Sequence, residues 1–101
     1  MATLDIDIPH TLGKEQALER VQGLLRKLQA DQKDIVQNVS ENWQGNEGAF
    51  SFSAKGFDLS GNIRVEDNKV HINGQLPFAL SFFKGKISQI IQEKAAEVLS
   101  K

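Results

Sequence analysis

The chain has 101 residues, of which 40% are hydrophobic and 25% are charged, and its net charge is −1. This length and composition are typical of one globular domain spanning residues 1–101, and they argue against a disordered or membrane protein. The near-neutral charge disfavours nucleic acid as a partner, and the absence of cysteine excludes disulfides, thiolate metal ligands and a cysteine nucleophile.

The first residues predict a short strand with one face in water. Apolar and acidic residues alternate from Leu4 to Ile8, and Pro9 ends the strand because it lacks a backbone donor. The segment is acidic where a signal peptide is basic, and it has no long apolar run. We therefore expect a full-length, cytoplasmic protein without a transmembrane segment.

A single helix is predicted next, with Thr11 as its N-cap and its end near Asp31. Its apolar residues recur at helical spacing on one face: Ala17, Val21, Leu24, Leu25 and Leu28. The other face is charged, so this helix is expected to pack by one side only.

Four more strands are predicted over residues 33–43, 50–54, 57–65 and 70–78, with polar or glycine-containing turns between them. Gly61 and Gly74 fall on the apolar side of the last two strands. A missing side chain there lets the sheet bend or a helix approach closely.

The final segment predicts a helix over residues 82–100. Its apolar stripe consists of Phe83, Ile87, Ile90, Ile91, Ala95, Val98 and Leu99. One-sided helices and a one-sided sheet must cover each other, so the predicted fold class is α+β. The expected order is β-α-β-β-β-β-α, with one antiparallel sheet and both helices packed on one of its faces.

Several short motifs, spread over nearly the whole chain, resemble the putative polyhydroxyalkanoic acid system family. They are His-Thr-Leu-Gly from His10 before a helix with Ala17 and Arg20, Trp-Gln-Gly-Asn from Trp43, Gly-Asn-Ile-Arg-Val from Gly61, and Leu-Pro-Phe and Phe-Lys-Gly-Lys-Ile between Leu76 and Ile87. These small bacterial proteins are often associated with polyhydroxyalkanoate storage genes. The resemblance implies a cytoplasmic protein linked to storage-granule metabolism, and it supplies no catalytic residues.

The first turn of the last helix is a candidate binding site. Lys84 and Lys86 lie where the helix dipole disfavours cations, and Gly85 lowers helix propensity. Together they suit an anion or an acidic partner. Phe82 lies off the apolar stripe and is expected to be exposed beside them. The alternative is that Gly85 permits close packing while both lysines simply reach water.

His10 and Trp43 are further candidate binding residues, although a structural role is favoured for each. His10 is expected to hydrogen-bond the turn after Pro9, and Trp43 to fill the core. His71 is expected to point outward from its strand, and the Asp5 and Asp7 carboxylates to lie on a solvated face. We assign no catalytic residue, no metal site and no cofactor.

These observations favour a non-catalytic binding or interaction module. Its expected partner is a storage-granule surface, another protein, or an acidic or acyl ligand. The alternative is a small acyl- or hydrophobic-ligand-binding protein, or an enzyme, with a pocket between helix and sheet lined by His10 and Trp43. A purely structural homodimer is a third possibility, so the expected oligomeric state is monomer or homodimer.

Overall fold

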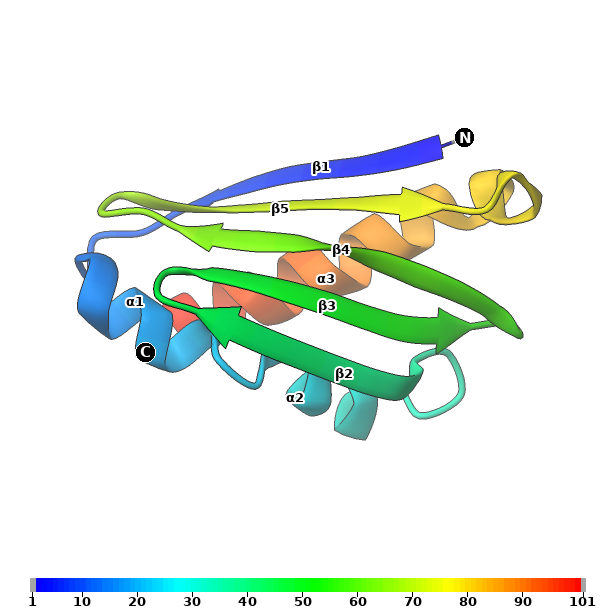
Figure 1. The fold of residues 1–101 in the computed structure, drawn as a ribbon, viewed down its shortest axis with the longest axis horizontal. Helices are drawn as coiled ribbons and strands as arrows, with labels where there is room; N and C mark the ends of the chain where they lie inside the picture. Colours follow the sequence, from blue (N-terminus) through cyan, green and yellow to red (C-terminus); the bar gives the residue numbers. More distant parts are fainter. Residues whose placement is uncertain (1, 101) are drawn as a thin grey trace.

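The computed structural model describes residues 2–100 and has an α+β fold with one five-stranded antiparallel sheet (Figure 1). The strands are β1 (Ala2–Pro9), β2 (Gln37–Gln44), β3 (Glu47–Ala54), β4 (Phe57–Val65) and β5 (Lys69–Leu76). The helices are α1 (Lys14–Val21), α2 (Leu24–Asp31), the short 3-10 helix η1 (Phe78–Phe83) and α3 (Lys84–Leu99). The predicted fold class and the single antiparallel sheet are confirmed.

The strand order across the sheet is β1-β5-β4-β3-β2. Strands β2 to β5 form a meander, and β1 lies beside β5, the last strand of the chain. The pairing of β1 with β5 runs without a shift from Ala2 opposite Leu76 to Pro9 opposite Lys69. At the other edge, β2 has an irregularity between Gln37 and Ser40.

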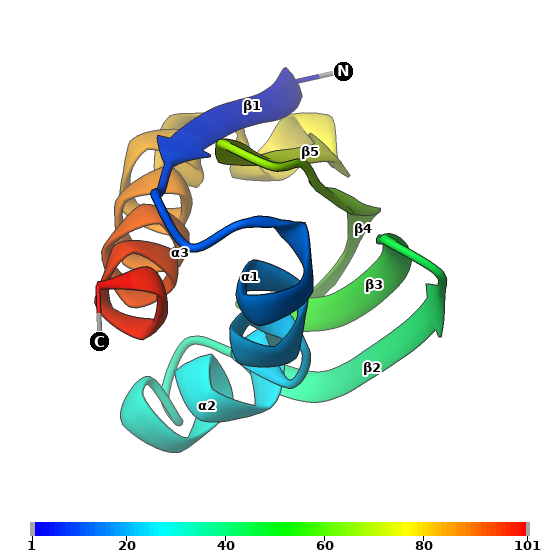
Figure 2. The same cartoon turned by 90° about the vertical axis from the view of Figure 1, so that its left-hand side faces the viewer.

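All the helices lie on the same side of the curved sheet (Figure 2). Apolar side chains from that face of the sheet and from the helices form one buried cluster. From β1 it includes Leu4 and Ile6, and from α3 it includes Ile87 and Ile91. Alternate residues of the strands point away from the helices into solvent, as the period-two pattern predicts.

The predicted first helix is in fact two helices, and the assignment of Thr11 as its N-cap is wrong. Gly13 precedes α1, no side chain caps that helix, and Thr11 is exposed. The chain breaks at Gly23, whose φ of 84° lies in the left-handed region that favours glycine. The apolar stripe continues across this break, so both short helices still pack against the sheet.

The last helix begins later than predicted. Pro77 ends β5, and the chain turns through η1 before α3 starts at Lys84. The predicted strand over residues 70–78 would place Phe78 on its apolar face, but strand alternation stops after Leu76 and Phe78 is 80% exposed. Leu80 is the buried residue of this turn.

An aromatic ring occupies the space left by the paired glycines Gly61 and Gly74. These residues face each other on β4 and β5, and Phe50 lies opposite Gly61 on β3. A Cβ added at Gly61 would lie 2.7 Å from Cζ of Phe50 and 2.0 Å from the carbonyl oxygen of Asn73. Gly61 is needed because the neighbouring strand and this ring pack too closely for a side chain, whereas a Cβ added at Gly74 would lie 3.2 Å from the Ser60 carbonyl oxygen.

Candidate functional site

Three large apolar side chains of residues 2–100 are exposed, and they gather at one end of the molecule. Phe78 and Phe82 are 80% and 84% exposed on η1, and Phe57 is 40% exposed at the start of β4. In Figure 1, η1 and the turn between β3 and β4 lie at the same end, on the right. Exposed apolar patches of this kind commonly mark interaction sites.

A direct contact joins the two parts of this end. Lys55, in the turn between β3 and β4, places its Nζ 5.3 Å from the centroid of the Phe83 ring. The Phe83 ring meets the Phe82 ring edge-on, with centroids 6.2 Å apart. Lys55 and Gly56 have φ values of 56° and 83°, the conformation of a tight two-residue hairpin turn. The hairpin thus presents Lys55 to η1.

Three lysines lie on the segments that carry the exposed rings, Lys55 in the turn before β4 and the other two at the start of α3, and we call the whole set the aromatic corner. It consists of Phe57, Phe78, Phe82, Lys55, Lys84 and Lys86. All three lysines are exposed, and within residues 2–100 none of them forms an ion pair. The first turn of α3 holds no acidic residue that would offset them. The corner therefore combines apolar surface with uncompensated positive charge.

Gly85 is not required for packing. A Cβ added there would meet no atom within 4 Å, so the alternative in which this glycine allows a close approach is wrong. Lys84 and Lys86 do reach water, as that alternative held.

His10 is a structural residue at the opposite end of β1. It is buried, and its Nδ1 accepts a hydrogen bond from the Leu12 N–H at 3.1 Å. Its Nε2 therefore carries the proton and donates to the Glu66 carbonyl oxygen at 2.9 Å. Both ring nitrogens form hydrogen bonds, so His10 joins the loop between β1 and α1 to the turn between β4 and β5.

Trp43 is half-buried on β2 and lies flat against Gly48, its partner on β3. A Cβ added at Gly48 would lie 2.7 Å from the indole ring, which explains the glycine. The indole Nε1 donates a hydrogen bond to Oε1 of Glu41 at 2.9 Å.

Glu41 is the residue that the sequence pattern did not single out. Its carboxylate accepts hydrogen bonds from the N–H groups of Gly23 and Leu25, both at 3.1 Å, at the start of α2. A carboxylate is favourable there because the first N–H groups of a helix lack partners. The signal was a lone acidic residue on the inward parity of β2.

The candidate residues do not form one site. Phe82, Lys84, Gly85 and Lys86 lie beyond the Leu76 end of β5, whereas His10 follows the far end of β1. Trp43 lies near the turn between β2 and β3, also far from the aromatic corner (Figure 1).

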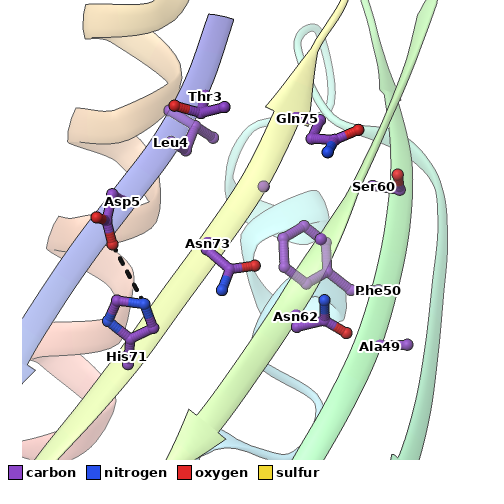
Figure 3. Close-up of a pocket in the computed structure, with 12 residues that line it drawn as sticks. Thr3, Leu4, Asp5, Ala49, Phe50, Ser60, Asn62, His71, Asn73 and Gln75 are labelled. Carbon is purple, nitrogen blue, oxygen red and sulfur yellow. Dashed lines mark ion pairs between the residues drawn. The ribbon is translucent and has the colours of Figure 1, made fainter.

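The outer face of the sheet carries a polar hollow of about 590 Å³ (Figure 3). Its polar side chains come from β1, β4 and β5: Thr3, Asp5, Ser60, Asn62, His71, Asn73 and Gln75. Within residues 2–100, the amides of Asn62, Asn73 and Gln75 have no side-chain hydrogen bond. The hollow is open and polar, without a nucleophile placed beside a base.

His71 lies between two carboxylates at the border of this hollow. Its Nδ1 is 2.5 Å from Asp7, and its Nε2 is 3.2 Å from Asp5. A protonated ring donates to both carboxylates, whereas a neutral ring donates to one of them. The hydrogen bond to His71 is the main reason why the pKa of Asp7 is lowered from 3.8. The cluster ties β1 to β5.

The described part of the chain holds no group of three or more metal-ligating side chains suited to a metal ion. None of its helices combines the length and the apolar character that crossing a bilayer requires.

Comparison with known proteins agrees with the fold. The family model described as putative polyhydroxyalkanoic acid system protein matches residues 4–99. The crystal structure of Ara h 8.0201 is similar with a TM-score of 0.52 and 12% sequence identity, and the match covers 99% of each chain. No curated protein matches the sequence.

Proposed function

Because the chain belongs to the family of putative polyhydroxyalkanoic acid system proteins, we propose that it is a non-catalytic module that binds the surface of polyhydroxyalkanoate granules through its aromatic corner. The single observation that carries this proposal is the gathering of Phe57, Phe78 and Phe82 at one end of the molecule. The proposal places the protein in the cytoplasm with its granules.

The chemistry of the aromatic corner suits such a surface. The storage polymer is a polyester, with apolar chain segments and ester carbonyl oxygens. Transferring the Phe78 and Phe82 rings from water to an apolar phase contributes about 2 kcal/mol each. Lys84 and Lys86 are placed to donate hydrogen bonds to carbonyl or anionic groups at the boundary. A rim of charge around exposed rings is typical of interfacial binding.

The alternative, a ligand or reaction pocket between helices and sheet, has less support. The interior between helices and sheet holds a contiguous cluster of buried apolar side chains, and the hollow of about 600 Å³ that His10 lines at the end of β1 does not include Trp43. His10 and Trp43, the residues expected to line it, are both engaged in structural hydrogen bonds. The likeness to Ara h 8.0201 supports the fold alone.

Granule binding is testable by co-sedimentation with isolated polyhydroxyalkanoate granules. Replacing both exposed rings, in Phe78→Ser/Phe82→Ser, is expected to weaken binding about 700-fold, because two ring transfers of about 2 kcal/mol each are lost. Reversing the charge, in Lys84→Glu/Lys86→Glu, is expected to weaken it severalfold and to reduce its dependence on salt.

The matched control is Lys14→Glu/Lys33→Glu, which makes the same charge change at two exposed lysines outside the aromatic corner. This control should bind like wild type. Equal binding by wild type and the double phenylalanine variant would refute the aromatic corner as the docking site. Circular dichroism checks that each variant is folded, which we expect because every replaced side chain is exposed.

A further inference from the structure

We propose that the free edge of β1, together with the groove between β1 and α3, binds an extended basic segment of a partner protein as an added strand. This inference goes beyond granule binding and uses a different surface. Strand addition of this kind draws affinity from backbone hydrogen bonds and specificity from alternate side chains.

The first observation is that β1 is an open, regular edge. It is paired to β5 over its whole length without a register shift, and it forms the upper border of the sheet in Figure 1. The opposite edge, β2, is interrupted by the irregularity near Asn38, whose φ is 56°. Bulges protect an edge against further pairing. Only β2 has this protection.

The second observation is the direction of the unpaired backbone groups. The His10 N–H donates to the Asn68 carbonyl oxygen at 3.0 Å. Hydrogen-bonded pairs alternate along an antiparallel ladder, so Thr3, Asp5 and Asp7 direct their N–H and C=O groups to the free edge. The backbone of Pro9 also faces the free edge, so the N–H that proline lacks is not needed for a hydrogen bond to β5.

The third observation is a groove beside this edge. A hollow of about 600 Å³ lies between the end of β1 and the last turns of α3, and another of about 560 Å³ runs along α3. The two have Gln92 and Ala96 in common, and the first is also lined by Asp7, Ile8 and Pro9 of β1. Short side chains at Ser88 and Ala96, and none at Gly85, leave room for the side chains of an added strand.

The charges indicate which segment fits. Asp5 and Asp7 lie on the outer face of β1, with side chains 74% and 55% exposed. His71 contacts one oxygen of each carboxylate, and within residues 2–100 the other oxygen has no partner. The groove on the other face is lined partly by Ile8 and Leu99. A fitting strand therefore alternates basic residues, above Asp5 and Asp7, with apolar residues directed into the groove.

A second copy of this chain fits less well. Antiparallel pairing of two β1 strands would place Asp5 and Asp7 of one copy against the same acids of the other. Like charges directly opposite each other in a sheet are destabilising. The occupant we infer is therefore a basic segment of another protein.

The test uses the full chain and a blocked seven-residue synthetic peptide that alternates lysine and valine. Titration into the ¹⁵N-labelled protein is expected to shift the amide signals of Thr3, Asp5 and Asp7, with a dissociation constant of about 10 to 500 μM. A matched peptide that alternates glutamate and valine should not bind. Failure of the lysine peptide to bind below about 1 mM would overturn the proposal.

Two pairs of variants locate the binding. Ala96→Trp fills the groove and should weaken peptide binding more than 10-fold, whereas Ala30→Trp, at an exposed position on α2, should not. Asp5→Asn/Asp7→Asn should weaken it severalfold, whereas Asp34→Asn/Asp67→Asn should not. Unchanged binding by Ala96→Trp would overturn the groove as the site. A wild-type dimer that Ala96→Trp abolishes would overturn the basic partner in favour of a second copy.

Discussion

At the scale of single residues, Glu41 links more of the structure than any candidate found by sequence pattern. Its carboxylate accepts two N–H groups at the start of α2 and the indole N–H of Trp43. One side chain thus joins β2 to the helical layer and fixes the position of the tryptophan. All three hydrogen bonds are partly buried.

Glu41→Ala is expected to lower the free energy of unfolding by about 2 kcal/mol, because it leaves three donors without an acceptor. Glu41→Gln should cost about half as much, since one oxygen remains to accept bonds. Urea unfolding monitored by the fluorescence of Trp43, the chain's single tryptophan, measures both values.

The control for this prediction is Glu47→Ala, which removes an exposed ion pair with Arg64. Exposed pairs of this kind contribute less than about 1 kcal/mol. If Glu41→Ala costs no more than Glu47→Ala, then the cap on α2 is not a stabilising interaction.

Side-chain exposure could be predicted only where the backbone period was identified correctly. Phe82 lies off the stripe of the last helix, and it is exposed as expected. Strand alternation extended past Pro77 would bury Phe78, but η1 begins at Phe78 and the ring is exposed. Phe78 is exposed because β5 ends at Leu76, and the alternation of apolar residues along the chain does not reveal that end.

At the scale of elements, the break between α1 and α2 shows the limit of periodicity. The stripe from Ala17 to Leu28 keeps helical spacing across the break, so it predicts one helix. A lone glycine inside a helix costs only about 1 kcal/mol and does not dictate a break. Here Glu41 on β2 binds the N–H groups exposed by the break. Gly23 marks the place of the break locally, but the side chain that satisfies the N–H groups there comes from a distant strand, which a local pattern does not contain.

Two glycine substitutions are expected to have opposite effects. Gly23→Ala should destabilise the protein by about 1 kcal/mol, because alanine is strained at a φ of 84°. Gly85→Ala should stabilise it by about 0.5 to 1 kcal/mol, because alanine is the better helix former and its Cβ meets open space.

Thermal unfolding of both variants checks this pair against wild type. A destabilising Gly85→Ala would mean that this glycine has a packing role after all. A neutral Gly23→Ala would mean that the turn between α1 and α2 relaxes at no cost.

At the scale of the whole molecule, ion pairs fasten opposite sides of the fold. On the outer face of the sheet, His71 binds Asp5 and Asp7 of β1. On the helical side, Lys94 of α3 binds Asp31 at the end of α2 and also Glu97. Hydrogen bonds to Asp31 and Glu97 raise the pKa of Lys94 from 10.5, and the bond to His71 lowers the pKa of Asp7 from 3.8.

These shifts predict where each pair loses its effect on stability. The lowered pKa of Asp7 gives stability that is present above pH 3.8 and is lost as the pH falls through the lowered value. The raised pKa of Lys94 gives stability that is present below pH 10.5 and is lost as the pH rises through the raised value. Melting temperatures across both ranges, for wild type, Asp7→Asn and Lys94→Met, measure these losses.

Each variant should reduce the pH dependence of the melting temperature in one pH range only, the acid or the alkaline limb of the curve. Asp7→Asn is expected to lose less stability than wild type during acidification and to keep the alkaline limb. Lys94→Met should show the reverse. An acid limb in Asp7→Asn as steep as that of wild type would rule out the bond between Asp7 and His71 as its source.

The fold class and most strands could be predicted because each strand carries its own alternation. The neighbours of β1 could not, since β1 lies beside a strand that is distant in sequence. For the same reason, the contacts of His71 with Asp5 and Asp7 could not be predicted from the sequence near any of the three residues. The aromatic corner was predicted in part, through Phe82 and the two lysines of α3, but Lys55 and Phe57 join it only through the fold.

The pairing of β1 with β5 also has a consequence for how the chain is made. Each residue of β1 leaves the ribosome 60 to 74 residues before its partner on β5, because Pro9 pairs with Lys69 and Ala2 pairs with Leu76. At about 5 to 20 residues per second, Leu4, Ile6 and Ile8 wait several seconds without cover. During translation the pairing of β1 with β5 therefore forms last. A nascent chain that stalls before β5 leaves the apolar side chains and the backbone hydrogen-bonding groups of β1 exposed to chaperones.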